Sequence, residues 1–327
     1  MPTDDSELPD LREIEAGLKD FQLRTARTVF RRLYLQASST HRFLVADEVG
    51  LGKTLIARAV IARTLHHLWD TVDRIDIVYI CSNADIARQN IKRLNVLGEE
   101  GKVLPTRITL LPIKLRDLNR NRINFISFTP GTSFDLKSNL GVVQERVLLY
   151  WLLQEIWHFT GRAPINVFQG NVRPENFRWR IRAFPDNHSI DRGLKKLFRR
   201  SLRTRIREAR ANGEDGLHKR FEWLCGEFRR TDSRISRQAR LERSAFIGEL
   251  RGLLAETCVE MLEPDLVIMD EFQRFKHLMS GEDDASVLAR QLFEYAEGSN
   301  AVRVLLLSAT PYKMYTLSDE TGDEDHY

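Results

Sequence analysis

The nine-residue string ADEVGLGKT at residues 46–54 constrains the fold of this chain more than any other feature. An apolar run at 43–45 precedes it, and the apolar-rich stretch 55–68 follows. We therefore expect a short strand, a tight loop and a helix. Gly50 and Gly52 allow the backbone to approach a ligand closely, and the positive end of the helix attracts anions. The pattern predicts a phosphate-binding loop.

Each residue of this loop has an expected partner in a nucleoside triphosphate. Lys53 would reach the β- and γ-phosphates, and the Thr54 hydroxyl would hold Mg²⁺. Three loop residues would cradle the phosphates with their backbone: Gly50, Leu51 and Gly52. The strict pattern GxxxxGK[ST] requires glycine at position 47, where this chain has Asp47. The interpretation therefore depends also on residues further along the chain.

Two later strings supply that context. The apolar segment 264–269 ends in Asp270 and Glu271. A carboxylate at the carboxyl end of a strand points into the crevice where α/β sheets bind ligands. Asp270 would complete the Mg²⁺ shell, usually through water, and Glu271 would polarise the attacking water. A further predicted strand, 302–307, runs into Ser308 and Thr310, whose hydroxyls would relay between the ATP site and a bound partner.

These three strings, in this order, resemble motifs I, II and III of superfamily 2 helicases and translocases. The sequence of the loop is most similar to motif I of the Swi/Snf-type branch and its bacterial relatives. These proteins are related to the DEAD/DEAH-box proteins. DEFQ at 270–273 fills the place of the D-E-x-H box. LKDFQLR at 18–24 resembles the glutamine motif, which implies that Gln22 contacts adenine. The resemblance covers roughly residues 18–135 and 262–315.

The resemblance implies a RecA-like, doubly wound parallel sheet that binds ATP and Mg²⁺. VYICSN at 78–83 occupies the place of motif Ia, and NFISFTPGTS at 124–133 occupies the place where a later strand meets nucleic acid. The resemblance makes Ser308 and Thr310 of motif III candidate nucleic-acid contacts. In the two segments named here, Asn83 and Thr129 are the candidate contacts. Ordinary turn or capping roles are equally open for both residues.

Bulk composition narrows the class of protein. Of the 327 residues, 42% are hydrophobic, which is enough for a sizeable core. No apolar run reaches the roughly 20 residues that span a bilayer, and the acidic start is not a secretory signal. The three cysteines, Cys81, Cys225 and Cys258, are far apart and fit neither a disulfide framework nor a zinc site. We expect buried or half-buried thiols, a cytoplasmic location and no membrane contact.

Charge is distributed unevenly along the chain. Residues 192–243 hold 17 basic and seven acidic side chains, a net charge of +10 in a chain whose total is +4. Such a segment attracts phosphate backbones, so Arg199, Arg200 and Arg203 are candidate nucleic-acid contacts. The alternative is a solvated helix face balanced by acids of a neighbouring domain. Three interleaved aromatic residues would either stack on bases or pack internally: Phe221, Trp223 and Phe228.

The order of patterns predicts four regions. Residues 1–36 form a helical segment with a break near Gly17, and 319–327 form an acidic tail. Residues 37–135 and 262–318 form the α/β lobe, and 136–261 form a long, basic helical insertion before motif II. Further predicted strands lie at 43–46, 75–81, 108–111 and 124–128. Predicted helices lie at 53–68, 85–97, 142–159, 193–211 and 218–262, with a loop-rich bridge at 164–190.

The function expected from these observations is that of an N-terminal ATP-binding lobe. It would hydrolyse ATP as part of a translocase or helicase that moves on nucleic acid, foremost double-stranded DNA. The resemblance implies restriction, genome defence or repair as settings. Superfamily 2 motors close ATP with an arginine from a second RecA-like lobe. The chain ends at Tyr327, so we expect that lobe from a longer chain or a partner, and weak activity without it. The alternative is a nucleotide-gated protein-interaction module with little or no hydrolysis.

Overall fold

Five short apolar segments form one parallel sheet at the centre of the fold. The structure is a computed structural model and describes residues 8–36, 39–48, 50–96, 107–113, 121–134, 139–188, 190–229, 235–275, 278, 281, 284–297 and 300–309. The strands of the sheet are β1 (Arg42–Ala46), β2 (Ile75–Ile80), β3 (Ile123–Phe128), β4 (Leu266–Asp270) and β7 (Arg303–Ser308). Their order is β1-β7-β4-β2-β3, and all neighbours are parallel. The predicted α/β class with a parallel sheet is confirmed.

These strands are nearly continuous apolar runs because both faces of the sheet are covered. All six residues of β2 are buried. Alternate residues of each strand point to opposite faces, so Val78 and Ile80 join one core while Ile77 and Tyr79 join the other. β4 follows β3 only after the long helical segment, yet it lies in the middle of the sheet between β7 and β2.

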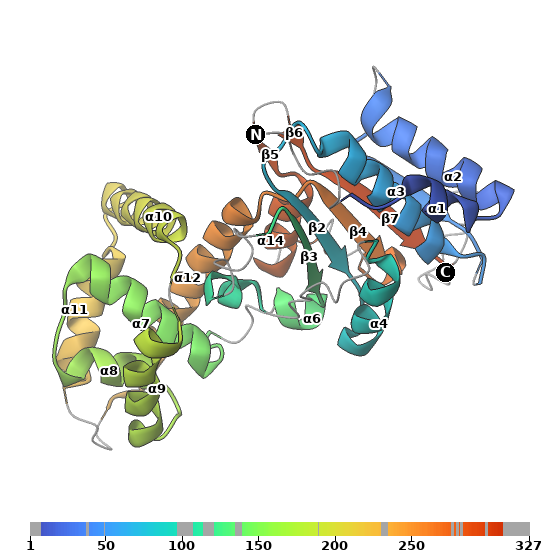
Figure 1. Cartoon of the computed structure of the whole chain (residues 1–327). Coiled ribbons are helices and arrows are strands. Elements are labelled where there is room, and N and C mark those ends of the chain that lie inside the picture. Colours follow the sequence, from blue (N-terminus) through green and yellow to red (C-terminus); the bar gives the residue numbers. More distant parts are fainter. Residues whose placement is uncertain are drawn as a thin grey trace, which may run out of the picture.

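The N-terminal helices cover one face of the sheet (Figure 1). They are α1 (Leu11–Ala16), α2 (Asp20–Phe30), α3 (Lys53–Leu68) and α4 (Ala84–Leu94), and α2 continues as the π-helix η2 (Arg31–Leu35). Ile56, Val60 and Ile61 of α3 are fully buried in this core. The predicted helix at 53–68 is confirmed at both ends.

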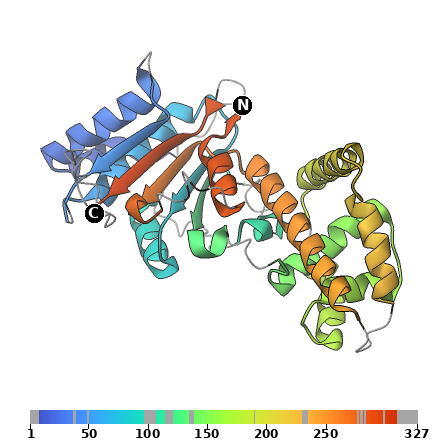
Figure 2. The same cartoon turned by 180° about the vertical axis from the view of Figure 1, so that it is seen from behind.

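The opposite face is covered by two helices from the second half of the chain and one short helix from the first half (Figure 2). They are α12 (Arg237–Leu262), α14 (Asp284–Phe293) and the 3-10 helix η3 (Ile108–Ile113). The 26 residues of α12 make a rod about 39 Å long. Its C-terminal part packs near the sheet, and its N-terminal part extends into a group of helices beside the sheet.

That group, which we call the helical arm, is composed of α7 (Val143–Trp157), α8 (Arg162–Gln169), α9 (Pro174–Asn187), α10 (Arg192–Ala211) and α11 (Leu217–Glu227), together with the N-terminal part of α12. Aromatic rings form its centre. Phe221 stacks on Phe246 with ring centroids 5.9 Å apart, and Phe168 contacts both. One hydrophobic cluster runs from this centre to the sheet, so the core is continuous across the predicted boundary near residue 261.

A buried ion pair joins α7 to α12. Glu145 and Arg251 are both 0% exposed, and Arg251 Nε lies 3.0 Å from Glu145 Oε2. Glu145 also accepts hydrogen bonds from the backbone N–H of Val142, at 2.7 Å, and from the Thr109 hydroxyl. Because every oxygen of the carboxylate has a partner, the pair satisfies its desolvated charges and holds the arm in one orientation.

Two element predictions were wrong. Residues 108–111 form η3 and not a strand, because Pro112 removes a backbone donor and the segment packs against α7 and α12 as a cover for the sheet. Residues 164–190 hold α8 and α9 and not a loop-rich bridge. Pro164 lies in the first turn of α8 and Pro174 is the first residue of α9, where proline is tolerated because the amide needs no helical partner.

A third prediction was partly wrong. The single helix expected over 218–262 is divided into α11 and α12, which pack against each other. Ser236 caps α12, its side chain accepting from the amide of Ala239 at 3.0 Å. This serine is a recognisable helix cap in the sequence. The residues on both sides of it have helical periodicity, however, so the sequence predicted one continuous helix. Phe221 and Phe228 are buried and pack internally, whereas Trp223 is 42% exposed.

The remaining described elements are short: α6 (Pro130–Ser133), η4 (Phe272–Phe275) and the two-residue strands β5 (Ala296–Glu297) and β6 (Asn300–Ala301). The three cysteines are free thiols, with Cys81 and Cys258 buried and Cys225 half-buried, as predicted. None of the helices in the described ranges combines the length and apolar character that crossing a membrane requires.

Candidate nucleotide site at the carboxyl edge of the sheet

The loop between β1 and α3 has the backbone of an anion-binding turn. Gly50 and Gly52 have φ values of +88° and +83°, a left-handed conformation that favours glycine. Gly52 directly precedes α3, whose first residues are Lys53 and Thr54. The N-terminus of this 16-residue helix therefore points its free amides and partial positive charge toward the loop.

Lys53 is folded into this loop. Its Nζ donates to the carbonyl oxygens of Asp47 at 2.7 Å and Glu48 at 2.8 Å. The ammonium group thus lies inside the curve of the backbone, where two carbonyls hold it in position. A positive charge, helix amides and glycine turns converge here, which is the chemistry that an oligophosphate requires.

Gln22 connects α2 to the same loop. Its Nε2 donates to the carbonyl of Leu51 at 2.9 Å, and its Oε1 accepts from the backbone N–H of Lys19 at 2.9 Å. Gln22 is only 5% exposed, and a Cβ added to Gly52 would lie 2.4 Å from its Nε2. Glycine at position 52 is therefore required twice, for its φ and for the approach of this side chain. The predicted adenine contact is a further role that these bonds neither require nor prevent.

Strand order brings the distant acid pair to the same edge of the sheet as the loop. Ala46 pairs with Ser308, and Asp270 pairs with Leu307, so β1 and β4 flank β7. Neighbouring strands lie about 4.8 Å apart, which places Ala46 and Asp270 roughly 10 Å from each other. The amide of Asp47 also donates to the carbonyl of Ser308 at 3.3 Å.

Two side chains that the sequence analysis did not single out hold Asp270. Its Oδ2 accepts from the Tyr79 hydroxyl at 2.6 Å and from Asn90 Nδ2 at 3.1 Å. Asn90 Nδ2 also donates to the Tyr79 oxygen at 2.9 Å. Burial, followed by the charge of Asp270, raises the pKa of Tyr79, so the hydroxyl remains a donor. One sequence signal could have indicated this contact. Tyr79 places a hydroxyl group in an otherwise apolar, buried strand, and a buried hydroxyl needs a hydrogen-bond partner.

Glu271 has an unusual backbone for a non-glycine residue, with φ +54°. Its carboxylate accepts from the Ser82 hydroxyl at 3.3 Å and lies 3.0 Å from Nε of Arg274. A left-handed residue at the end of a strand costs free energy, and such outliers concentrate at functional sites. The side chain remains 34% exposed, so it can reach a ligand at the edge of the sheet.

The predicted nucleic-acid contacts divide into different environments. Asn83 is exposed at the end of β2 and caps α4, its side chain accepting from the amide of Asp85 at 2.7 Å. Thr129 begins α6 at the end of β3, the neighbouring strand. Ser308 is 1% exposed and so offers no surface to a nucleic acid in this structure, contrary to its predicted contact. Thr310 lies outside the described residues.

The three candidate arginines lie elsewhere. Arg199, Arg200 and Arg203 belong to α10 of the helical arm, which both views place at the far end of the molecule from α4 (Figures 1 and 2). Arg200 forms an ion pair with Glu260 of α12, so part of its charge is neutralised. The structure does not bring these arginines to the edge that holds Lys53 and Asp270.

Comparison with protein-family models, curated protein sequences and solved structures found no match. Functional inference therefore rests on the residues of this chain and their geometry.

Proposed function

We propose that this chain is the ATP-binding lobe of an ATP-dependent translocase or helicase that acts on nucleic acid, foremost double-stranded DNA. The fold proposed is RecA-like. One observation carries the proposal: the lysine loop and the Asp270–Glu271 pair lie at one edge of a parallel sheet, on either side of β7. Ligands bind in α/β sheets at this carboxyl edge.

The residues present fit a nucleoside triphosphate. Gly50 and Gly52 give the loop the left-handed turns that curve its backbone around Lys53, whose ammonium group already lies inside the curve. On binding, the ammonium would exchange its two carbonyl partners for phosphate oxygens. Gln22 would hold the loop against α2 through its hydrogen bond to Leu51. We also propose that Gln22 contacts adenine.

The residues also fit Mg²⁺, which takes few protein ligands and keeps several waters. Thr54 lies in the first turn of α3, and Asp270 has its Oδ2 fixed by Tyr79 and Asn90. In the part of the chain that the structure describes, Asp270 Oδ1 has no hydrogen-bond partner and is available to a metal-bound water. Bound there, the ion would offset charge on the phosphates.

Glu271 is the residue we propose to orient the attacking water. Its carboxylate is partly exposed and next to Asp270, but Arg274 and Ser82 now occupy one oxygen. Ser82 lies two residues beyond the end of β2 and next to Asn83, so its hydrogen bond joins Glu271 to the segment expected to meet nucleic acid. A change at that strand end would be transmitted to Glu271 through this hydrogen bond.

Two further parts, a second lobe and a cytoplasmic location, complete the proposal. A second RecA-like lobe would supply the arginine that stabilises the γ-phosphate, a contribution worth about 10³–10⁵ in rate. Without it, we expect slow turnover. A cytoplasmic location accords with the three free thiols.

Two substitutions test the site. Lys53→Ala should lower ATP affinity about 100-fold, or about 2.7 kcal/mol, because it removes the charge inside the loop. Glu271→Gln should keep binding and slow hydrolysis by about 10²-fold or more, because the amide is a poor base. Titration with a fluorescent ATP analogue and single-turnover phosphate release measure the two effects.

The matched controls are Lys219→Ala and Glu175→Gln, which alter exposed side chains of the helical arm. Unchanged ATP affinity in Lys53→Ala would refute the site. Parental hydrolysis in Glu271→Gln would refute the role of that acid. Tight ATP binding without any hydrolysis in the parent protein, even with DNA, would favour the nucleotide-gated interaction module.

A further inference from the structure

The basic residues of α10 fall into two groups that face in different directions. Six of them recur at intervals of three or four residues and therefore lie on one side of the helix: Arg192, Lys196, Arg199, Arg203, Arg207 and Arg210. At 3.6 residues per turn these positions occupy a sector about 80° wide. We call this set the basic stripe.

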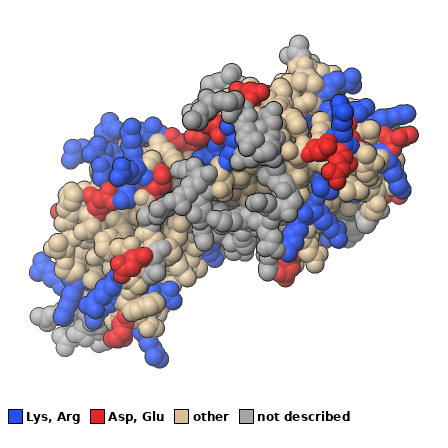
Figure 3. All heavy atoms as spheres, viewed as in Figure 1, with Lys and Arg blue, Asp and Glu red and all other residues tan. Residues whose placement is uncertain are grey.

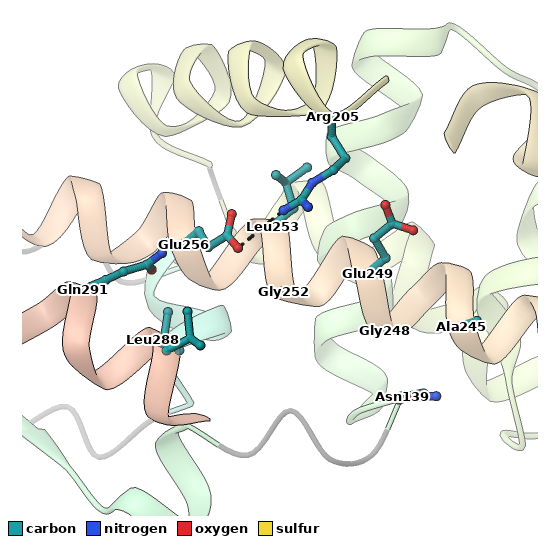
Figure 4. Close-up of a pocket in the computed structure, with 11 residues that line it drawn as sticks. Asn139, Arg205, Ala245, Gly248, Glu249, Gly252, Leu253, Glu256, Leu288 and Gln291 are labelled. Carbon is teal, nitrogen blue, oxygen red and sulfur yellow. Dashed lines mark ion pairs between the residues drawn. The ribbon is translucent and has the colours of Figure 1, made fainter. Parts of the chain in front are cut away.

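The other basic residues of α10 pair with acids of the arm. Lys195 lies 2.5 Å from Glu155 of α7, Arg200 pairs with Glu260 of α12, and Arg205 lies 3.6 Å from Glu256 of α12. Figure 4 shows Arg205 reaching across a cleft of about 340 Å³ toward Glu256. These three ion pairs attach α10 to the rest of the arm. They also neutralise the positive charges of the three basic side chains that form them.

The basic stripe has no such partners. Among the described residues, no carboxylate forms an ion pair with any of its six side chains. Five of the six are exposed and Arg199 is half-buried. Figure 3 shows a dense group of Lys and Arg side chains over α10. Glu208, the one acid in this helix, lies about 140° from the centre of the stripe.

Packing keeps the stripe in a fixed direction. Leu194, Phe198 and Leu202 are all 0% exposed and pack α10 against the arm, α12 included. From Arg192 to Arg210 the helix rises about 27 Å, at 1.5 Å per residue. The stripe is thus a straight, rigid row of cations and not a flexible tail.

We infer that the basic stripe binds the phosphate backbone of double-stranded DNA without reading its sequence. The inference rests on the proposed function, in which the protein moves along nucleic acid. Five of the six cations are arginines, whose planar guanidinium groups form paired hydrogen bonds to phosphate. A row about 27 Å long spans roughly eight base pairs of rise, at 3.4 Å per pair.

Other occupants fit this surface less well. A helix that binds a membrane inserts its apolar face, but the apolar face of α10 is buried against the arm. Proteins that bind single strands use exposed aromatic rings for stacking, and the one aromatic residue of α10, Phe198, is 0% exposed. A protein partner needs an apolar interface core, which the stripe does not provide.

The position of α10 makes this contact separate from the edge of the sheet. α4 and α6 lie at the edge that holds the candidate site, whereas α10 lies at the other end of the molecule in both views (Figures 1 and 2). The duplex bound by the stripe is therefore a segment different from the one near Asn83 and Thr129. The helical arm would lengthen the footprint of the lobe on DNA.

The experiment compares two variants of the full chain that each lose three positive charges. The stripe variant carries Arg199→Gln, Arg203→Gln and Arg207→Gln, and the control carries Arg173→Gln, Arg180→Gln and Arg182→Gln at exposed sites of the arm. Fluorescence anisotropy with a labelled duplex of about 30 base pairs, over about 50 to 200 mM salt, gives affinity and salt slope. Circular dichroism checks the fold of both.

We expect the stripe variant to lose at least ten-fold in affinity, and its log–log salt slope to become shallower by about 2.7, since each phosphate contact contributes about 0.9. The control should change less than two-fold. Equal losses in both variants, an unchanged salt slope or no duplex binding by the parent protein would overturn the inference. Binding of the parent to anionic vesicles that the stripe variant loses, with duplex affinity kept, would also overturn it.

ATP binding, measured in the same proteins, separates this inference from the proposed function. A stripe variant that keeps duplex affinity while the parent binds ATP through Lys53 refutes the stripe alone. A parent that binds duplex through the stripe but binds no ATP refutes the nucleotide site alone.

Discussion

The two ends of the parallel sheet both carry buried or half-buried acids, but the acids have different surroundings. At the carboxyl edge, Asp270 keeps one oxygen available and Glu271 adopts a left-handed backbone beside a partly exposed ion pair. At the amino edge, each carboxylate oxygen of Asp76 has a partner, one in an ion pair and the other in a hydrogen bond. Its Oδ2 lies 2.8 Å from Arg74, and its Oδ1 accepts from Asn124 at 2.9 Å.

The amino edge also fastens the long helix to the sheet. Arg74 donates to the last carbonyls of α12, those of Met261 at 3.1 Å and Leu262 at 3.2 Å. The carboxylate of Asp265 accepts from the amide of Asp76 at 2.8 Å. These hydrogen bonds fix the C-terminus of α12 and the starts of β2 and β4 to one another. We therefore interpret the amino edge as structural. The carboxyl edge leaves polar groups for a ligand.

The largest effect should come from Arg74→Ala. It would leave Asp76, whose side chain is 1% exposed, without its cation and the end of α12 without its donor. Removing one partner of a buried pair costs about 3 kcal/mol or more. At the carboxyl edge, Arg274→Ala removes the partner of Glu271 from a position 62% exposed and should cost less than about 1 kcal/mol. Urea unfolding measures both, and equal costs would contradict the comparison.

A smaller effect concerns pH. Burial raises the pKa of Asp265 to about 7, whereas an unfolded aspartate titrates near 4. The folded chain therefore binds more protons than the unfolded chain between these values, and stability should fall as pH rises from about 4 to about 7. Asp265→Asn should flatten this fall by on the order of 2 kcal/mol. The free energy of unfolding at several pH values is the measurement, and an unaltered slope in the variant would contradict the assignment.

A smaller effect than that of Asp265→Asn should come from Tyr79→Phe, which removes the hydroxyl bound to Asp270 and keeps the ring. Loss of one hydrogen bond to a carboxylate costs about 1.5 kcal/mol. If Asp270 helps to hold Mg²⁺, the variant should need about ten-fold more Mg²⁺ for half-maximal ATP binding. Its affinity for ATP without metal should change little. Asn166→Ala, which removes a buried hydrogen bond inside the arm, is the comparison variant. A purely structural Tyr79 would lower stability and leave the Mg²⁺ titration unaltered.

Sequence patterns sufficed where the signal is local. Each of the predicted strands at 43–46, 75–81 and 124–128 was found within one residue at either end, because a buried parallel strand is a short apolar run. Helix patterns failed at 164–190, where prolines at helix starts look like loop residues. The strand pattern failed at 108–111, where an apolar run packs as a 3-10 helix.

The partners of the candidate site were not accessible from the sequence. Tyr79 and Asn90 meet Asp270 only because β2 lies next to β4, and nothing local records that strand order. The bond from Gln22 to Leu51 likewise depends on how α2 packs on α3. Ser308 was expected to face a nucleic acid, but its strand lies between β1 and β4, which buries it.

By itself, the sequence determined the loop chemistry of Gly52 and Lys53, the acid pair at 270–271 and the excess of arginine in α10, since these depend on residue type and spacing along one segment. Which acids lie at the ligand edge, and which arginines form ion pairs, depends instead on how the whole chain packs. The reason is physical: a strand order and a helix face are set by burial of apolar surface across the whole chain, and polar side chains take the partners that this burial leaves beside them.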